Sequence, residues 1–445
     1  MSKAAAFLND PPAADDRPSF ETIIKHGHQD LVQAVAFNNH GDRCATGSVD
    51  GKIRVFNRHK DGAWRLCDTW GAHASEILEI QWLPTTVYPN LLASLGIEGR
   101  FKLWAEDPAA PPGRRFSDTS SGVPMAKPAF ETRNARSPYR SFSLKHLDDS
   151  RLTYLALLSA DGTLTVYEND HIENLASFTQ LDDTAAPTTT STAAAATALP
   201  PTGPKPAARG EETSFRVRFD PNPEVCYTAL RAGVPSDALG LVVAVMDVVR
   251  VYRTRDTIRA TLGMAAAGKG FYLAAEVPRG VHGGLVRDVA WAPGNIRGYD
   301  VVATACQDGW VRVVKRHAER RRLDGEDGAV RAALMASSGI RAGLDHQSSS
   351  GGGRAGPERK DGTTATAAAM AAAATLPGQI RHVMTEISRM DSHHTPVWRV
   401  AFDDDGQILG SVGDEGKLVC YRQKPDGSWA KSTEMAIVKM KMAAP

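Results

Sequence analysis

The sequence predicts an all-β protein, and three observations lead to this fold class. A short pattern recurs five times: a small residue, four further residues, an acid-Gly pair, and then alternating polar and apolar residues. A strand-like run lies upstream of the copies, and another run follows several of them. An acid-Gly pair between two such runs is a strong hairpin signal, and its repetition indicates a repeat architecture. The copies are Ala45–Phe56, Ala93–Trp104, Ala156–Tyr167, Ala303–Val314 and Gly410–Tyr421.

The turn acid and the upstream run occupy the same places in each copy. The acids lie six residues before the final apolar residue, and they are Asp50, Glu98, Asp161, Asp308 and Glu415. The upstream runs alternate or are nearly continuously apolar, as expected for buried inner strands. They are Leu31–Phe37, Ile77–Trp82, the weaker Ser141–Leu147, Leu285–Trp291 and Val397–Phe402.

An irregular unit and a set of outer strands complete the pattern. Phe215–Phe219 followed by Leu239–Tyr252 forms a further unit, whose turn around Asp247 lacks the glycine. The predicted outer strands are Trp64–Trp70, Ile172–Phe178, Phe271–Val277 and Trp429–Val438. Four short antiparallel strands per unit are typical of a propeller blade, and one blade buries its faces only by stacking on others. The sequence therefore predicts a β-propeller of six blades.

A single domain accommodates these units. We expect residues 20–440 to form the propeller, after a disordered N-terminus at residues 1–19 and before a C-terminal tail at residues 441–445. Three segments poor in aromatic and β-branched periodicity are predicted to be disordered insertions. They span residues 105–138, 182–210 and 317–375.

The composition narrows the class of protein. The chain has 445 residues, 42% of them hydrophobic and 23% charged, which is ordinary for a globular protein. Its net charge of +1 gives no general electrostatic reason for direct binding to nucleic acid or to an anionic membrane. Five scattered cysteines without a CxxC motif indicate reduced thiols rather than a disulfide framework. We expect no signal peptide, and the apolar run Leu239–Val249 is too short to span a bilayer.

Three units combine a histidine, a hydroxyl side chain and the turn acid, a combination that also occurs in catalytic triads. Because the set recurs, a structural hydrogen-bond network is favoured over catalysis, which needs only one site. The expected sets are His28 with Thr46 or Ser48, Asp50 and Phe56; His73 with Ser94, Glu98 and Trp104; and His394 with Ser411, Glu415 and Tyr421. No catalytic residue or cofactor site is predicted. No metal site is predicted either, because adjacent His393 and His394 lack a metal-ligand spacing.

Two further motifs are given structural interpretations. Gly263–Lys269 matches the start of a phosphate-binding P-loop, but Gly270 follows where Ser or Thr would hold magnesium, and no helix follows. We therefore expect a flexible loop there. The basic residues Lys315–His317 and Arg320–Arg322 could form a nucleic-acid patch or an import signal, but nearby acids dilute them, which favours the start of a solvated loop.

Several stretches together resemble the Seh-type WD40 nucleoporins, which are close relatives of the Sec-thirteen coat protein. The resemblance covers about two thirds of the chain, and the departures from it are the long loops and the irregular fourth blade. It rests on His28–Val32, His40–Phe56, Asp61–Trp64, His73, Val286–Tyr299, Pro396–Val400 and Pro425–Trp429.

The resemblance implies a non-catalytic scaffold with an open six-bladed propeller. Members of this family bind an elongated helical nucleoporin in the outer-ring Y-complex of the nuclear pore, and the partner inserts its own blade. They also join a vacuole- or lysosome-associated complex that regulates signalling through the target-of-rapamycin kinase. The expected location is therefore the nuclear pore and nuclear envelope, with a second one at the vacuole through partners. Two alternatives stay open: a secretory-coat propeller, and a WD40 substrate-recognition adaptor.

The strand count supports an open ring independently. In closed rings of this type an N-terminal strand usually completes the last blade, whereas here the sixth hairpin has its own candidate outer strand, Trp429–Val438. The run Phe20–Lys25 is then left over, unless it closes blade six and Trp429–Val438 is only a tail. Unpaired strand edges invite strand addition from a partner. The residues predicted to bind the partner are Phe20, Thr22, Ile23 and Ile24, with strand edges of the first and sixth blades.

Overall fold

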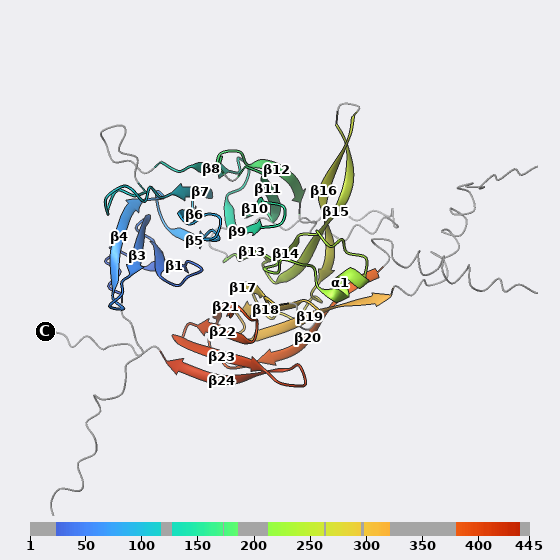
Figure 1. The fold of residues 1–445 in the computed structure, drawn as a ribbon. Helices are drawn as coiled ribbons and strands as arrows, with labels where there is room; N and C mark the ends of the chain where they lie inside the picture. The colour runs from blue at the N-terminus through green and yellow to red at the C-terminus, as the bar shows by residue number, and fades with distance from the viewer. Residues whose placement is uncertain are drawn as a thin grey trace, which may run out of the picture.

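The chain folds into six four-stranded antiparallel sheets, which form the blades of a β-propeller in the computed structural model (Figure 1). The structure describes residues 24–116, 127–171, 173–185, 212–261, 264–294, 298–320 and 380–436. Every blade consists of four strands that follow one another in the sequence. The first strands of consecutive blades contact one another, so these strands form the inner wall of the ring. The predicted all-β, six-bladed propeller is confirmed.

The strand boundaries follow the repeated pattern of the sequence. Blade 1 contains β1 (Val32–Phe37), β2 (Arg43–Ser48), β3 (Lys52–Arg58) and β4 (Trp64–Gly71). Blade 2 contains β5 (Ile77–Trp82), β6 (Leu91–Gly96), β7 (Arg100–Ala105) and β8 (Phe130–Arg133). Blade 3 contains β9 (Tyr139–Leu147), β10 (Leu152–Ser159), β11 (Thr163–Asn169) and β12 (Thr179–Ala185).

The second half of the ring has longer hairpins. Blade 4 contains β13 (Phe215–Phe219), β14 (Gly240–Val245), β15 (Val248–Thr261) and β16 (Met264–Glu276), with the short helix α1 (Tyr227–Arg231) between β13 and β14. Blade 5 contains β17 (Val286–Trp291), β18 (Val301–Cys306), β19 (Val311–Arg320) and β20 (Ile380–Met390). Blade 6 contains β21 (Val397–Phe402), β22 (Ile408–Gly413), β23 (Lys417–Gln423) and β24 (Trp429–Ala436).

The acid-Gly pairs form the turns between the second and third strands of five blades. Their glycines all have positive φ; in blade 1, Gly51 has φ of 74°, a conformation that glycine adopts without steric cost. A Cβ atom on Gly51 would also lie 2.4 Å from the carbonyl oxygen of His73, so the turn packs against the next blade. Blade 4 lacks the glycine, and Met246 takes the positive φ instead, at 57°.

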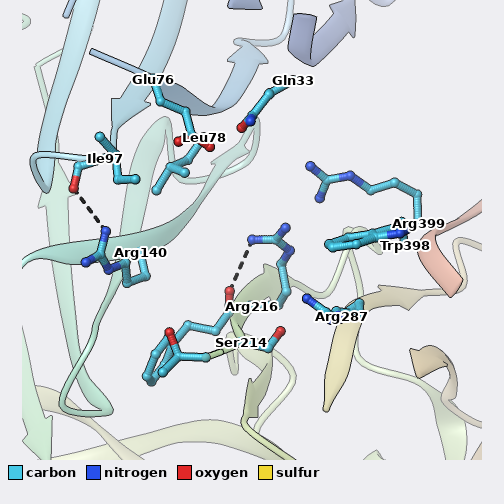
Figure 2. Close-up of a pocket in the computed structure, with 12 residues that line it drawn as sticks. Gln33, Glu76, Leu78, Ile97, Arg140, Ser214, Arg216, Arg287, Trp398 and Arg399 are labelled. Carbon is cyan, nitrogen blue, oxygen red and sulfur yellow. Dashed lines mark hydrogen bonds between the residues drawn. The ribbon is translucent and has the colours of Figure 1, made fainter. Parts of the chain in front are cut away.

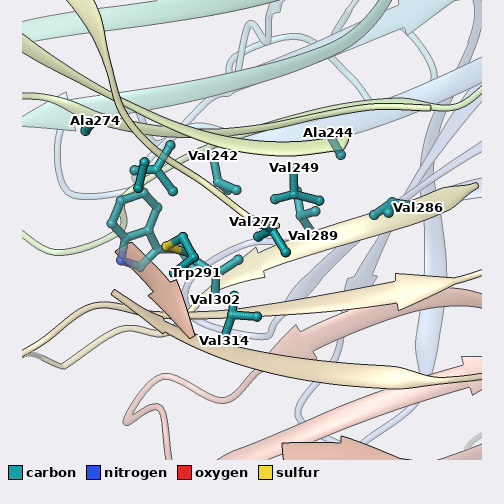
Figure 3. Packing of buried hydrophobic residues seen from close by; sticks show 13 residues of the cluster. Val242, Ala244, Val249, Ala274, Val277, Val286, Val289, Trp291, Val302 and Val314 are labelled. Atoms are coloured by element: carbon teal, nitrogen blue, oxygen red, sulfur yellow. The ribbon is translucent and has the colours of Figure 1, made fainter. Parts of the chain in front are cut away.

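Neighbouring blades are joined by apolar clusters between their facing sheets. The cluster between blades 4 and 5 includes Val242 and Val249 from blade 4 and Val289, Trp291 and Val302 from blade 5 (Figure 3). Equivalent clusters join blades 1 and 2, 2 and 3, 3 and 4, and 5 and 6. These clusters carry most of the hydrophobic stabilisation, because a blade alone leaves both faces of its sheet exposed.

The first and last blades lack such a cluster. Across the described residues, no buried apolar cluster combines side chains of blade 6 with side chains of blade 1. The inner strands β21 and β1 likewise do not pack extensively against each other in that part of the chain, although each packs against its other neighbours. Within the described residues, six blades are therefore joined by five apolar interfaces.

Two outer strands differ from the prediction. In blade 3 the outer strand is Thr179–Ala185 rather than Ile172–Phe178; residues 173–178 belong to a turn in which Asn174 O accepts from Asn169. In blade 2, Phe130–Arg133 lies inside the expected loop 105–138 and pairs with β7. Edge strands are buried on few positions, so neither has the apolar periodicity that marks an inner strand. The outer strand of blade 6 is β24, close to its predicted position.

The irregular blade 4 corrects the loop predicted at the P-loop-like motif. Met264–Lys269 is the start of β16, which pairs with β15 over a long hairpin (Figure 1); Gly263 lies outside the described residues. Lys269 Nζ contacts Asp237 Oδ2 at 2.6 Å, so this lysine already has a carboxylate partner. The motif is therefore a strand, not a flexible loop.

The basic cluster near residue 316 is also corrected, because Arg316 is buried rather than solvated. Its guanidinium pairs with Asp300, which also accepts from Arg253 Nη2 at 3.1 Å. Arg253 Nη1 lies 3.0 Å from Asp220 Oδ2, and all four side chains are at most 3% exposed. Asp220 follows the end of β13 and Asp300 precedes β18, so this ionic network links blades 4 and 5 through Arg253 on β15 and Arg316 on β19.

Candidate partner-binding site

In blade 1 the predicted hydrogen-bond network centres on His28. Its Nδ1 lies 3.2 Å from Asp50 Oδ2, and its Nε2 lies 2.9 Å from Thr46 Oγ1. Ser48, the other candidate hydroxyl, instead donates to Asp30 O. Burial lowers the pKa of His28, and Asp50 only partly opposes this effect. Burial alone would raise the pKa of Asp50, but two backbone amides and His28 donate to it and lower its pKa.

Blade 2 contains a network of the same kind. His73 Nδ1 lies 2.6 Å from Glu98 Oε1, and its Nε2 lies 2.8 Å from Ser94 Oγ. Trp104 Nε1 donates to the same Ser94 hydroxyl at 2.9 Å, whereas Glu98 Oε2 is buried without a hydrogen-bond partner among the described residues. The network connects the loop before β5 with β6, with β7 and with the turn between these two strands.

Blade 6 repeats this arrangement with a different histidine from the one predicted. His393 Nδ1 lies 2.5 Å from Glu415 Oε1, and its Nε2 lies 2.6 Å from Ser411 Oγ, which also contacts the Tyr421 hydroxyl. The expected residue, His394, is exposed. Successive side chains of an extended segment point in opposite directions, so only one of the two adjacent histidines can enter the blade.

The turn acids of blades 3 and 5 have other partners. Asp161 accepts from the Thr163 amide at 2.9 Å, and within the described residues no histidine contacts it. Asp308 pairs with Arg312 Nη2 at 2.6 Å. His282, which the residue-by-residue prediction omitted, lies 3.0 Å from Thr304 Oγ1, and burial lowers its pKa to about 4. The sequence signal that could have identified His282 is its position in the loop before the inner strand of blade 5, where the other blade histidines lie in their own blades.

These networks hold blades together and do not converge on one reaction centre. The same set of side chains occurs in blades 1, 2 and 6, each within its own sheet. The described part of the chain contains no group of three His, Cys, Asp or Glu side chains able to hold a metal ion. In the same residues, no helix has the length and apolar character needed to cross a membrane.

The residues predicted to bind a partner fall mostly outside the described chain. Phe20, Thr22 and Ile23 precede its first residue, and Ile24 is half-buried in a segment without regular structure. Within the described residues, the sheet of blade 6 contains β21 to β24 and no N-terminal strand. The prediction also assigned partner binding to strand edges of the first and sixth blades. The burial of the outward faces of these two blades bears on that assignment.

Blade 6 leaves one face incompletely buried. In blades 2 and 5 every residue of the second strand is buried, and in blades 1, 3 and 4 all but one terminal residue are. In β22 burial alternates instead: Leu409 and Ser411 face blade 5 and are buried, whereas Gly410 and Val412 are half-buried. Leu418, Cys420 and Met435 continue this second face across β23 and β24.

Blade 1 exposes apolar side chains on the face turned away from blade 2. On β1, Ala34 is buried in the cluster shared with blade 2, whereas Val35 is 56% and Phe37 55% exposed. Leu66 on β4 is exposed too, and the Phe37 ring packs edge-on against Trp64. Large apolar side chains gathered on one sheet face are typical of an interaction surface. We call the outward faces of blades 1 and 6 the terminal faces.

Fold and hydrogen-bond networks together define a WD40-repeat β-propeller, and residues 20–57 and 384–422 match the family model described as "WD domain, G-beta repeat". The chain is 57% identical to Nucleoporin SEH1 of Chaetomium thermophilum over the full length of both chains. It is 27% identical to Nucleoporin SEH1 of Saccharomyces cerevisiae, over 89% of this chain and 93% of the relative. Nucleoporin seh1 of Schizosaccharomyces pombe is 24% identical over 89% and 90%. The chain belongs to the nucleoporin SEH1 family.

Proposed function

We propose that this protein is a non-catalytic structural subunit of the nuclear pore complex, in which a helical nucleoporin of the outer-ring Y-complex inserts strands between blades 6 and 1. The relatives are named nucleoporins, which supports the nuclear pore complex as the location of this protein. The observation that carries the insertion is that, in the part of the chain that the structure describes, six blades are joined by five apolar interfaces.

The terminal faces explain why an inserted blade would bind tightly. Burial of a Val, Leu or Phe side chain contributes about 1.5–3 kcal/mol relative to leaving it in water. Val35, Phe37 and Leu66 on one side and Val412 and Leu418 on the other are positioned to make this contribution together. A partner sheet with apolar side chains on both faces would pack as every other blade of the ring does.

We propose that the protein is not catalytic because the blade networks recur. Each His–acid–hydroxyl set is repeated in a separate blade, and in blades 1, 2 and 6 it lies within one sheet. A structural role accounts for all three sets, whereas a reaction centre would account for one of them.

Three earlier expectations remain predictions. Phe20, Thr22 and Ile23 could add a strand to the inserted blade or to blade 6, and they lie outside the described residues. The role in a vacuole-associated complex that regulates target-of-rapamycin signalling rests on the family resemblance alone. The use of the propeller as a substrate adaptor has no supporting observation, and the names of the relatives favour the pore over a secretory coat.

The proposal is tested by co-expressing the chain with the helical Y-complex nucleoporin and measuring how much of each co-purifies. Phe37→Asp places a charge on the terminal face of blade 1, where burial would cost several kcal/mol. We expect recovery of the partner to fall about tenfold or more, as for a substitution at the centre of an interface.

Leu230→Asp is the matched control, because Leu230 is an exposed apolar residue on α1, in blade 4. It should leave partner recovery unchanged. Equal recovery with Phe37→Asp and Leu230→Asp would contradict insertion at the terminal faces, provided that both variants have the melting temperature of the wild-type chain.

A further inference from the structure

A pocket of about 660 Å³ opens where the beginnings of all six inner strands converge (Figure 2). One side chain per blade illustrates how the wall is built: Gln33, Leu78, Arg140, Arg216, Arg287 and Arg399. The pocket lies at the end of the ring from which the His-bearing loops enter the blades. Its volume falls within the range of sites for small ligands and peptide side chains, and it is too small for a folded domain.

The wall of this pocket is rich in arginine. Four guanidinium groups line it, from blades 3, 4, 5 and 6, against a single carboxylate, that of Glu76. Arg140 donates to Ile97 O at 3.0 Å, and Arg216 donates to Phe215 O at 3.2 Å (Figure 2). Backbone carbonyls orient these side chains but do not neutralise their charge.

Acids outside the lining offset most of this charge, and because Arg218 shares Glu79 and Asp288 with Arg216, five guanidinium groups stand against four carboxylates. Arg287 pairs with Glu212, and Arg216 lies 3.6 Å from Glu79 and 3.6 Å from Asp288. The Arg399 side chain has neither a hydrogen bond nor an ion pair with any described residue.

Two of these arginines also carry unused donors. The Nε atoms of Arg216 and Arg287 are buried without a hydrogen-bond partner, and the Arg287 side chain is only 7% exposed. Buried donors without partners are costly, so a rearrangement of either side chain that let a bound anion accept from such a donor would be favourable.

An exposed aromatic ring stands beside these arginines. Trp398 is 41% exposed, and the Arg287 guanidinium lies 4.2 Å from the centre of its ring. Its Nε1 donates to Asp414, which fixes the indole. Leu78, Ile97 and Phe215 supply further apolar surface in the same pocket. The site therefore combines fixed cations with apolar contact area.

We propose that this pocket binds an extended acidic peptide of another chain. A carboxylate or phosphate side chain of the peptide enters beside Arg399 and Arg216, and an adjacent apolar residue packs on Trp398. Guanidinium groups bind such planar or tetrahedral oxyanions in bidentate fashion. The apolar lining and the Glu76 carboxylate favour a peptide over a free polyanion, whose charge would meet Glu76.

The test is fluorescence anisotropy with the full chain at low salt. The probes are fluorescein-labelled Gly-Leu-Glu-Leu-Glu-Leu-Gly, the same peptide with phosphoserine in place of each Glu, and the same peptide with Gln. We expect the Glu and phosphoserine peptides to bind with a Kd below about 1 mM and the Gln peptide to bind about tenfold more weakly. The stronger of the first two identifies which oxyanion the site takes.

Arg399→Gln should weaken binding of the acidic peptides about tenfold, which corresponds to about 1.4 kcal/mol. Arg399 helps to lower the pKa of the buried Glu79 carboxyl, but Glu79 keeps its ion pairs with Arg216 and Arg218 in this variant. Arg422→Gln, which removes an exposed arginine on β23, is the charge-matched control and should bind as the wild type does. Arg140→Gln, on another blade, should also weaken binding.

Three results would overturn the proposal. They are the absence of binding by both acidic peptides, equal affinity in Arg399→Gln and Arg422→Gln, and tighter binding of inorganic triphosphate than of either peptide. The last result would identify a site for a small anion. Denaturation curves of each variant show that it is folded, so a loss of affinity is attributable to the pocket.

Discussion

His393 Nδ1 lies 2.5 Å from Glu415 Oε1, whereas the next residue, His394, is exposed. The pair connects the loop before β21 with the turn between β22 and β23, and Ser411 extends the connection to the middle of the sheet. Identical residue types thus occupy adjacent positions, one inside the blade and one outside it. Such a pair offers a test of the blade network with its own control.

Replacement of the inner histidine should destabilise the protein. His393→Ala leaves one Glu415 oxygen without its partner and removes one of the two partners of the Ser411 hydroxyl, which costs about 1–3 kcal/mol in the free energy of unfolding. His394→Ala removes no described contact and should change it by less than about 0.5 kcal/mol. Urea denaturation followed by tryptophan fluorescence measures both. Equal effects of the two substitutions would contradict the structural role of His393.

Acid should weaken blade 5 through His282. Burial lowers the pKa of His282 to about 4, from an unperturbed value of 6.5, with a smaller contribution from Arg312. Between these two values the unfolded chain binds a proton that the folded chain excludes, so stability rises with pH over this window. The contribution is complete above pH 6.5 and is lost as the pH falls toward 4. For this group we expect a loss of about 2 kcal/mol between pH 7 and pH 5.

His282→Asn separates this effect from general acid denaturation. Asparagine can still hydrogen-bond to Thr304, but it does not titrate, so the variant should lose less stability than the wild type between pH 7 and pH 5. Denaturant midpoints at the two pH values provide the comparison. If the wild type and the variant show the same pH dependence, His282 is not held neutral in the folded protein.

The buried network around Asp300 should be sensitive to the removal of its acid. Asp300→Ala leaves the buried guanidinium groups of Arg253 and Arg316 with fewer compensating charges, which costs about 3–5 kcal/mol. Asp61→Ala breaks the exposed ion pair with Arg65, which solvent and salt screen, so it should leave stability almost unchanged. Thermal melting should show a large decrease for the first variant and almost none for the second. Similar decreases would indicate that Asp300 does not compensate these arginines.

The repeated pattern allowed the inner part of every blade to be predicted. Apolar runs such as Ile77–Trp82 and Val397–Phe402 matched strands residue for residue, because part of their apolar side chains pack into the clusters between neighbouring blades. The outer strands were harder, since β8 and β12 lie at sheet edges and contain few apolar residues. Their positions depend on pairing with β7 and β11 rather than on their own sequence.

The site was only partly predictable, because side-chain direction and contacts between distant residues decide which side chains take part. Sequence spacing placed the histidine of blade 6 within one residue, but it could not decide which of two adjacent side chains points inward. Arg316 was assigned to a solvated loop because Asp300, the buried acid that compensates its charge, is distant in sequence. The terminal faces became visible only when the burial of β22 could be compared with that of the second strands in the other five blades.

Cys420 is a natural probe for the proposed insertion of a partner strand. It lies on the terminal face of blade 6 and is half-buried, whereas the other four cysteines are buried, and all five are free thiols in the described residues. In the chain alone, an alkylating reagent should therefore modify Cys420 first. Burial also raises the pKa of Cys44 to about 11, which slows its reaction further.

The alkylation rate of Cys420, measured by mass spectrometry with and without the helical Y-complex nucleoporin, tests the inserted blade most directly. We predict that the partner slows this rate by about tenfold or more, because it removes solvent access to the thiol. A cysteine introduced by Tyr227→Cys on the exposed surface of α1 should react at the same rate in both samples. An unchanged rate at Cys420 in a complex that forms stoichiometrically would contradict insertion between blades 6 and 1.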